Sequence, residues 1–102
     1  MSKHVAEIVT FKLAAGVSPE KFVSLSQATE AFVRAQAGFV HRQLSQGEDG
    51  SWTDYVIWKD METARKVAAE FHNQDFCGDL MAAIAPDTAN MRHETVLWGM
   101  AS

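Results

Sequence analysis

The chain of 102 residues contains one cysteine, two prolines and no long apolar run. Cys77 therefore has no partner for an internal disulfide, and a half-buried structural thiol is its simplest interpretation. The longest apolar run, Leu80 to Ala85, is far shorter than the about 20 residues of a membrane span. No apolar segment follows the opening Met-Ser-Lys-His, so we expect no signal peptide. These absences predict a cytoplasmic protein without membrane contact.

Positive charge is in the minority, since nine Lys and Arg residues stand against 13 Asp and Glu residues and the formal net charge is −4. Because no basic cluster could bind a phosphate backbone, we expect no nucleic-acid partner. The four histidines are scattered without the spacing of a metal-binding motif, so no metal site is expected. The glycines at 47 and 50 read as a turn rather than as a phosphate-binding loop.

The remaining composition is that of one globular domain spanning residues 1–102, with 47% apolar and 22% charged residues. Apolar residues that recur with period two predict strands, at residues 5–13, 39–46, 51–58 and 90–98. Apolar residues at helical spacing predict helices, at residues 18–38, 61–72 and 76–85. Ser18-Pro19-Glu20 is a typical helix start, and Gly38 and Pro86 are typical stops.

The order of these elements predicts an α+β domain with a ferredoxin-like βαββαβ topology, in which a four-stranded antiparallel sheet carries both main helices on one face. The opposite face is also expected to be apolar, because the residues assigned to it are Ile8, Val40, Leu44, Tyr55, Ile57, Met91 and Leu97. An exposed apolar face of that size needs a cover. The simplest cover is the same face of a second copy, so the sequence predicts a homodimer paired through the sheet.

Polar residues interrupt the face expected beneath the helices. If the loop at residues 47–50 closes symmetrically, Gln43 opposes Asp54 and His41 opposes Val56. That face then carries Glu7, His41, Gln43, Asp54, Arg92 and Glu94 beside Trp52, Trp58 and Trp98. Arg42 and His93 are expected on the opposite face, in hydrogen bonds across the dimer. Buried polar groups either pair with one another or surround a ligand, and both interpretations stay open.

Several segments resemble the antibiotic-biosynthesis-monooxygenase-like domains of the dimeric α/β-barrel superfamily. They are Gly38-Phe39-Val40, Trp58, Met61-Glu62-Thr63-Ala64 and the stretch from Phe71 to Asp75-Phe76. The opening Val5 to Leu13 with Ser18-Pro19-Glu20 is also similar to the stress-responsive branch of the superfamily. The resemblance spans nearly the whole chain. It implies a homodimeric α/β barrel that binds a small molecule.

Known members of the superfamily include haem-degrading enzymes and cofactor-independent monooxygenases that act on aromatic polyketides or quinols. The haem-degrading members use an Asn, a Trp and a His, and the corresponding positions here are Val9, Val67 and roughly Cys77. Haem degradation is therefore not expected. The monooxygenase-like members commonly carry His residues on the second helix, where this chain has Val67 and, further along, His72.

The leading hypothesis is a cofactor-independent monooxygenase that acts on a flat aromatic or quinol-type metabolite. A deprotonated substrate supplies its own electrons, so the protein needs a base, a dry pocket and hydrogen bonds to the anion. His41 or Asp54 is the expected base, and Arg92 is expected to stabilise the anion.

Glu7, Trp58 and His72 are the expected ligand-binding residues. Trp58 is alternatively a core anchor beneath the second helix, and His72 alternatively complements a helix dipole. Two further hypotheses compete with the monooxygenase. One is a non-catalytic ligand-binding or stress-associated dimer, and the other is isomerase or lyase chemistry with the same base and no oxygen.

Overall fold

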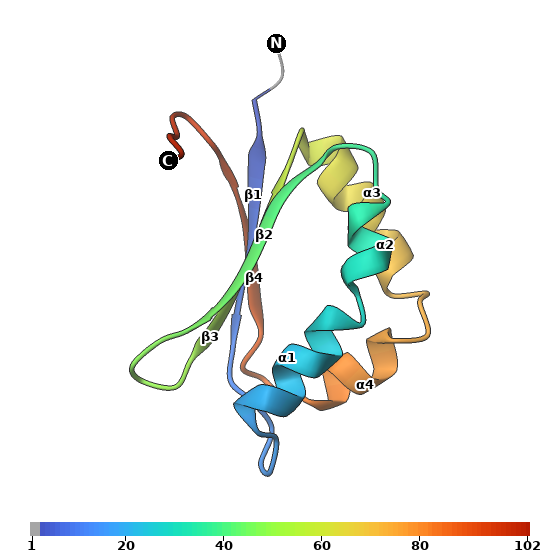
Figure 1. Ribbon diagram of the computed structural model, residues 1–102, viewed down its shortest axis with the longest axis vertical. Helices are drawn as coiled ribbons and strands as arrows, with labels where there is room; N and C mark the ends of the chain where they lie inside the picture. Colours follow the sequence, from blue (N-terminus) through green and yellow to red (C-terminus); the bar gives the residue numbers. More distant parts are fainter. Residues whose placement is uncertain (1–2) are drawn as a thin grey trace.

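The computed structural model describes residues 3–102 and shows one sheet with helices on one side (Figure 1). The strands are β1 (Val5–Phe11), β2 (Phe39–Gln46), β3 (Trp52–Trp58) and β4 (Asn90–Thr95). The helices are α1 (Pro19–Gln27), α2 (Glu30–Arg34), α3 (Met61–Phe71) and α4 (Cys77–Ala82). The strands are antiparallel in the order β2-β3-β1-β4. The predicted ferredoxin-like α+β fold is confirmed.

The first predicted helix divides into α1 and α2. As predicted, Ser18 caps its start, because the Ser18 hydroxyl accepts a hydrogen bond of 3.1 Å from the Lys21 N–H. The break falls at Thr29, whose hydroxyl donates a 2.7 Å hydrogen bond to the carbonyl of Ser26. A Ser or Thr hydroxyl that bonds back to a carbonyl of the preceding turn bends a helix. The side chain of Thr29 is thereby directed into the interior, where none of its surface is exposed.

The loop between β2 and β3 has five residues, 47–51, instead of the predicted four. The Gly47 N–H bonds the Ser51 carbonyl at 2.7 Å, and the Asp49 carboxylate accepts hydrogen bonds from the hydroxyl and the N–H of Ser51. These bonds from Ser51 hold the pKa of Asp49 below its usual value. Arg42 consequently opposes Val56 and His41 opposes Ile57. The predicted register of β2 is wrong by one residue.

A one-residue slip moves every side chain of a strand to the other face of its sheet. Residues 41–46 are reversed in this way, whereas Phe39 keeps its predicted partner, Trp58, because a β-bulge between Phe39 and His41 absorbs the difference. Arg42 and Leu44 therefore lie under the helices. His41 and Gln43 lie on the open face, where they hydrogen-bond each other.

The predicted orientation of β4 is also wrong. Glu7 opposes His93 and Val9 opposes Met91, so His93 and Met91 share the helix-covered face with Glu7. Arg92 points to the open face and pairs there with Glu94. The strand is shorter than the predicted 90–98, and β4 itself contains a single apolar residue, Met91. The alternation expected over residues 90–98 therefore could not assign its faces. The position at which β4 begins is determined by two backbone hydrogen bonds between the end of β1 and the segment after α4. The Ala14 N–H donates to the Ala83 carbonyl, and the Ala85 N–H donates to the Lys12 carbonyl.

The core lies between the sheet and the helices in two clusters of buried residues. One holds Phe11, Phe22, Trp52, Leu80 and Ala83, and the other holds Val33, Val56, Trp58, Ala64 and Val67. Asp60 caps α3 by accepting a hydrogen bond of 2.8 Å from the Thr63 N–H. Hydrogen bonds from the Thr63 side chain and backbone hold the pKa of Asp60 below its usual value. Trp58 packs beneath α3, which agrees with its predicted place in the core.

Among residues 3–102, no helix covers the other side of the sheet (Figure 1). Several large apolar side chains of β2 and the C-terminal segment are exposed there or close by, among them Val40 at 45%, Leu97 and Trp98 at 78% and Met100 at 83%. Within residues 3–102, the helices are all too short or too polar to cross a lipid bilayer.

Candidate functional site

A cavity of about 240 Å³ lies between the sheet and the helices. Residues of all four strands form its floor, and its other walls come from all four helices and from residues 72, 84 and 89. Most lining side chains are apolar, with Val9 and Val56 on the sheet and Val67, Phe71 and Ile84 opposite them. The polar exceptions are Glu7, Arg42, Asp54 and His72. An apolar enclosure with few polar groups is typical of a small-molecule site.

The charged groups of the floor belong to two pairs on neighbouring strands. One row of residues crosses the sheet from β2 to β4. Val56 on β3 lies between Arg42 and Glu7, and Glu7 lies in turn beside His93. Asp54 stands two residues from Val56 on β3 and faces the same way. The pair of Arg42 and Asp54 therefore lies toward the β2 edge, and the pair of Glu7 and His93 lies toward the β4 edge. The apolar Val56 lies between Arg42 and Glu7.

The pair at the β2 side is a bidentate ion pair. Arg42 Nε donates to Asp54 Oδ1 at 3.1 Å, and Nη2 donates to Oδ2 at 2.7 Å. Arg42 Nη1 donates to the hydroxyl of Thr29 at 2.7 Å. The two charged side chains are about four-fifths buried, with exposed fractions of 17% and 21%. Both oxygens of Asp54 are engaged, so this carboxylate is poorly placed to take a proton from a ligand.

The pair at the β4 side leaves a carboxylate oxygen available. His93 Nε2 lies 3.0 Å from Glu7 Oε2, and in the described part of the chain this is the one hydrogen bond that the side chain of Glu7 makes. The side chain of Glu7 is 12% exposed and that of His93 is 24% exposed. Glu7 lines the cavity, whereas His93 stands behind it. The second oxygen of Glu7 has no partner among residues 3–102 and can therefore accept a proton from a molecule in the cavity.

The cavity opens between the end of α3, α4 and the start of β4. Met81 and Met91 are about half exposed there, and His72 and Ala89 are exposed cavity-lining residues. His72 follows α3 directly, and its Nδ1 lies 3.8 Å from the sulfur of the buried Cys77. Flexible methionine side chains can adapt to different shapes, so this mouth could admit a flat molecule.

Four of the six predicted site residues line the cavity, namely Glu7, Asp54, Trp58 and His72. The other two, His41 and Arg92, lie on the open face and cannot reach it, so their predicted place beneath the helices is wrong. The sequence reasoning instead missed Arg42 and His93, which it assigned to the open face. One signal could have found Arg42. An Asp two residues before Ser51 favours a side-chain-capped turn, which lengthens the loop to five residues and moves Arg42 under the helices.

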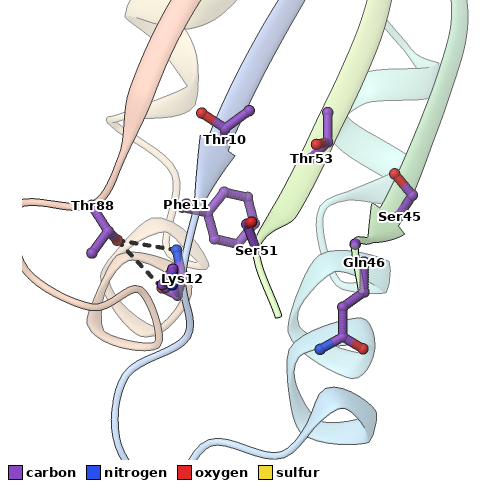
Figure 2. A pocket seen from close by; sticks show the side chains of 9 residues that line it. Thr10, Phe11, Lys12, Ser45, Gln46, Ser51, Thr53 and Thr88 are labelled. Carbon is purple, nitrogen blue, oxygen red and sulfur yellow. Dashed lines mark hydrogen bonds between the residues drawn. The ribbon is translucent and has the colours of Figure 1, made fainter. Parts of the chain in front are cut away.

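Two other hollows lack such an arrangement. The larger, of about 520 Å³, lies at the hairpin end of the sheet. Figure 2 shows Thr10, Thr53 and Ser45 side by side on the sheet there, with Thr88 hydrogen-bonded to the backbone of Lys12. This hollow holds hydroxyl groups and one lysine but no acid–base pair. A groove of about 260 Å³ along α1 and β2 shares Val33 and Arg42 with the cavity.

Solved structures with the same architecture include oxygenases and proteins without a stated function. The structure superposes on SnoaB from Streptomyces nogalater, a cofactor-independent oxygenase, with a TM-score of 0.79 and 22% identity over 99% of this chain and 100% of that one. It superposes on the monooxygenase ActVA-Orf6 of Streptomyces coelicolor, solved with the ligand nanaomycin D, with a TM-score of 0.72 and 15% identity over 98% and 93%.

A third structure, from Bordetella bronchiseptica and classed with the antibiotic biosynthesis monooxygenases, gives a TM-score of 0.80 and 12% identity over 95% of this chain and 100% of that one. The chain has the fold of these monooxygenase-like proteins. No protein-family model matches the sequence, and a search of curated proteins gives no match. The likeness to the monooxygenase-like proteins is therefore one of fold, and it extends over nearly the whole length of the chains compared.

Proposed function

We propose that this protein is a cofactor-independent monooxygenase that oxidises a small phenol or quinol in the cavity between sheet and helices. The observation that carries the proposal is the carboxylate of Glu7, which lines an apolar cavity with one oxygen held by His93 and the other available. The fold shared with SnoaB and ActVA-Orf6 supports it. The predicted bases are revised accordingly, since His41 faces away from the cavity and Asp54 is occupied by Arg42.

The chemistry begins when Glu7 takes the proton of a ring hydroxyl, which leaves an electron-rich anion. A positioned general base of this kind typically accelerates a reaction by about 10²- to 10⁴-fold. The anion then transfers electrons to molecular oxygen, and a carbon–oxygen bond forms on the ring. Loss of water completes the oxidation. One oxygen atom stays in the product as a quinone carbonyl, and the other leaves as water with two hydrogens from the substrate.

The other cavity residues hold this arrangement in place. His93 positions Glu7 by occupying Oε2. Asp54 and Thr29 orient the guanidinium of Arg42, whose remaining N–H groups can donate to the anion. Arg42 thus takes the role that the sequence suggested for Arg92. Val67 and Phe71 form apolar walls that exclude water, which strengthens each electrostatic interaction inside.

Oxygen consumption tests the proposal, with 1,5-dihydroxynaphthalene as the probe and the protein-free rate subtracted. We expect one quinone formed for each O₂ consumed, and we expect Glu7→Gln to lower the rate about a hundredfold or more. His41→Ala is the matched control because His41 is exposed on the other face of the sheet. It should keep the wild-type rate.

Two outcomes would contradict the proposal. A Glu7→Gln variant with undiminished oxygen uptake would remove Glu7 from the mechanism. Binding of the naphthol without any oxygen uptake would instead favour the non-catalytic ligand-binding protein.

We further propose that two copies pair through the open face of the sheet. The exposed apolar side chains on and next to that face, Val40, Leu97 and Trp98 among them, support the pairing, because large exposed apolar patches mark interaction surfaces. A two-fold pair buries the same patch on both copies and leaves no second patch exposed. The cavity is on the helix side of each sheet, so each copy would keep its own site.

A further inference from the structure

The cavity and the groove beside it share a wall. The groove, of about 260 Å³, runs between α1, α2 and the edge strand β2. Val33 and Arg42 line both hollows, so these two side chains separate one hollow from the other. The mouth of the cavity lies at the opposite edge of the sheet, next to β4. For a ligand that enters through the mouth, the shared wall is therefore the far end of the cavity.

Arg42 is held in this wall by hydrogen bonds in two directions. Asp54 accepts hydrogen bonds from its Nε and Nη2 at 3.1 and 2.7 Å, and the Thr29 hydroxyl accepts one from Nη1 at 2.7 Å. Thr29 is fully buried and is itself bonded to the Ser26 carbonyl. A bidentate arginine–carboxylate pair fixes the plane of the guanidinium as well as its position. Arg42 therefore cannot move aside for a ligand without breaking three hydrogen bonds.

Val33 completes the wall from the helix side. The residue is 6% exposed and packs in one cluster with Val56 and Trp58. A valine in a helix has one strongly preferred side-chain rotamer, so this part of the wall is stiff as well. Beyond the wall, the half-buried side chains of Phe39 and Leu44 line the groove. An aromatic ring would find apolar surface there if the wall did not exclude it.

The row of residues across the sheet indicates the length of the site. From the β4 edge it passes His93, Glu7 and Val56 and ends at Arg42. Glu7 and Arg42 are two strands apart, a separation of about 9–10 Å. An apolar protein cavity of about 150 Å³ holds one benzene molecule, and the cavity here has about 240 Å³. One ring or two fused rings fit before the wall, and a third ring would have to project through the mouth.

We propose that Arg42 and Val33 form a fixed end wall that determines the length of the substrate, so that the site takes aromatic compounds of one or two fused rings and keeps a third ring out of the groove. The inference rests on the proposed function for the identity of the cavity as the substrate site. It adds a specificity-determining role for these two residues and an upper size for the substrate.

The test compares 2-naphthol with 2-hydroxyanthracene, which carry the same hydroxyl group and differ by one fused ring. Their dissociation constants are measured by fluorescence in oxygen-free buffer, so that neither compound is oxidised. Arg42→Ala combined with Asp54→Ala removes the wall without leaving an unpaired carboxylate. Arg42→Leu combined with Asp54→Leu is the matched control, because it removes the same two charges but keeps apolar bulk in the wall.

The measured quantity is the ratio of the two dissociation constants. Loss of a hydrogen bond from Arg42 affects both hydroxyl groups alike, so the ratio reports the length of the ring system. In the wild type we expect 2-hydroxyanthracene to bind no more tightly than 2-naphthol, because its third ring stays in solvent. The alanine pair should shift the ratio about tenfold in favour of three rings, which the groove can then bury. The leucine pair should keep the wild-type ratio.

A second pair of variants tests the wall from the helix side and leaves the ion pair intact. Val33→Ala should shift the ratio about threefold in favour of three rings. Val67→Ala is its control, since Val67 is also a buried valine on the cavity wall but does not line the groove. It should keep the wild-type ratio. This pair decides the question if the alanine pair at residues 42 and 54 does not fold.

Three results would overturn the inference. They are equal ratios in the alanine and leucine pairs, a wild type that binds the three-ring compound more tightly, and a wild type that does not bind 2-naphthol. The outcomes also separate this inference from the proposed function. A ratio that follows the wall in a protein that consumes no oxygen supports the wall and overturns the monooxygenase. Oxygen uptake that depends on Glu7, with equal ratios in the two pairs, supports the monooxygenase and overturns the wall.

Discussion

Thr29 connects the break between the first two helices to the ion pair on the cavity floor. Its hydroxyl donates to the carbonyl of Ser26 and accepts from Arg42 Nη1, each at 2.7 Å. No part of the residue is exposed. A single side chain therefore bends the helical segment and places one end of the guanidinium of Arg42. A stability measurement on variants of Thr29 can separate these contributions from packing.

We expect Thr29→Val to lower the free energy of unfolding by about 1–3 kcal/mol, because it leaves a partly buried guanidinium N–H without its acceptor while keeping the side-chain volume. Thr29→Ser retains the hydroxyl and is the matched control. It should lose only the small contribution of one methyl group, about 1 kcal/mol. Urea unfolding of the three proteins measures the difference. A Thr29→Val variant as stable as the wild type would show that the hydrogen bond from Arg42 contributes nothing.

At this scale, the sequence indicated which residue types the site would contain but not which individuals. Glu7, Asp54 and Trp58 were correctly expected at the helix-covered face, since β1 and β3 alternate clearly. His72 was expected at the end of a helix, where it follows α3 directly. Arg42 and His93 were exchanged for His41 and Arg92. In β2 and in β4 the residue at the site is the direct neighbour of the predicted one. The strands were therefore predicted correctly, and the error lies in which of their faces points to the helices.

At the scale of elements, the hairpin of β2 and β3 decides the composition of the site. Its five-residue loop moves Arg42 under the helices, and the bulge at Val40 returns Phe39 to its place opposite Trp58. Just before β2, Gly38 adopts a φ of 93°. An added Cβ there would lie 2.8 Å from Lys59 Cγ and 3.1 Å from Thr63 Cγ2. The turn into β2 therefore requires glycine for both its backbone angle and its space.

Gly38→Ala should destabilise the protein by more than the about 1–2 kcal/mol that a left-handed backbone costs a residue with a Cβ. Gly50→Ala is the matched control, because Gly50 has a φ of 85° but no atom within 4 Å of an added Cβ. It should show the backbone cost alone. The difference in urea midpoint between the two variants then reports the close approach of Lys59 and Thr63, and identical midpoints would contradict that contact.

At the scale of the whole molecule, the helices cover one face of the sheet and leave the other without cover (Figure 1). If two copies pair through the open face, light scattering should give a mass twice 11.3 kDa. Ile57 faces that side, opposite Ala6 and His41. Ile57→Lys should raise the dimer dissociation constant about tenfold or more, because the two-fold pair meets the buried charge twice.

Val23→Lys is the control for this variant, since Val23 is an apolar residue of α1 with 40% exposure on the helix side. It should leave the mass unchanged. A wild-type protein with a mass of 11.3 kDa at micromolar concentration would contradict the dimer. A mass that falls equally in both variants would show that the open face is not the interface.

The sequence by itself determined the elements and their order. Alternation in β1 and β3, the Ser18 and Asp60 caps and the helical spacing of apolar residues are local signals, and each depends on residues close together in the chain. They were sufficient to predict a ferredoxin-like α+β fold with its helices on one face of the sheet.

Only the tertiary structure decided which side chains meet. The face of β2 depends on one extra loop residue and a compensating bulge, and the face of β4 depends on backbone hydrogen bonds to the end of β1. These contacts join residues that are distant in sequence, and a shift of one residue reverses a strand. The pairing of Glu7 with His93 and of Arg42 with Asp54 is a consequence of that register.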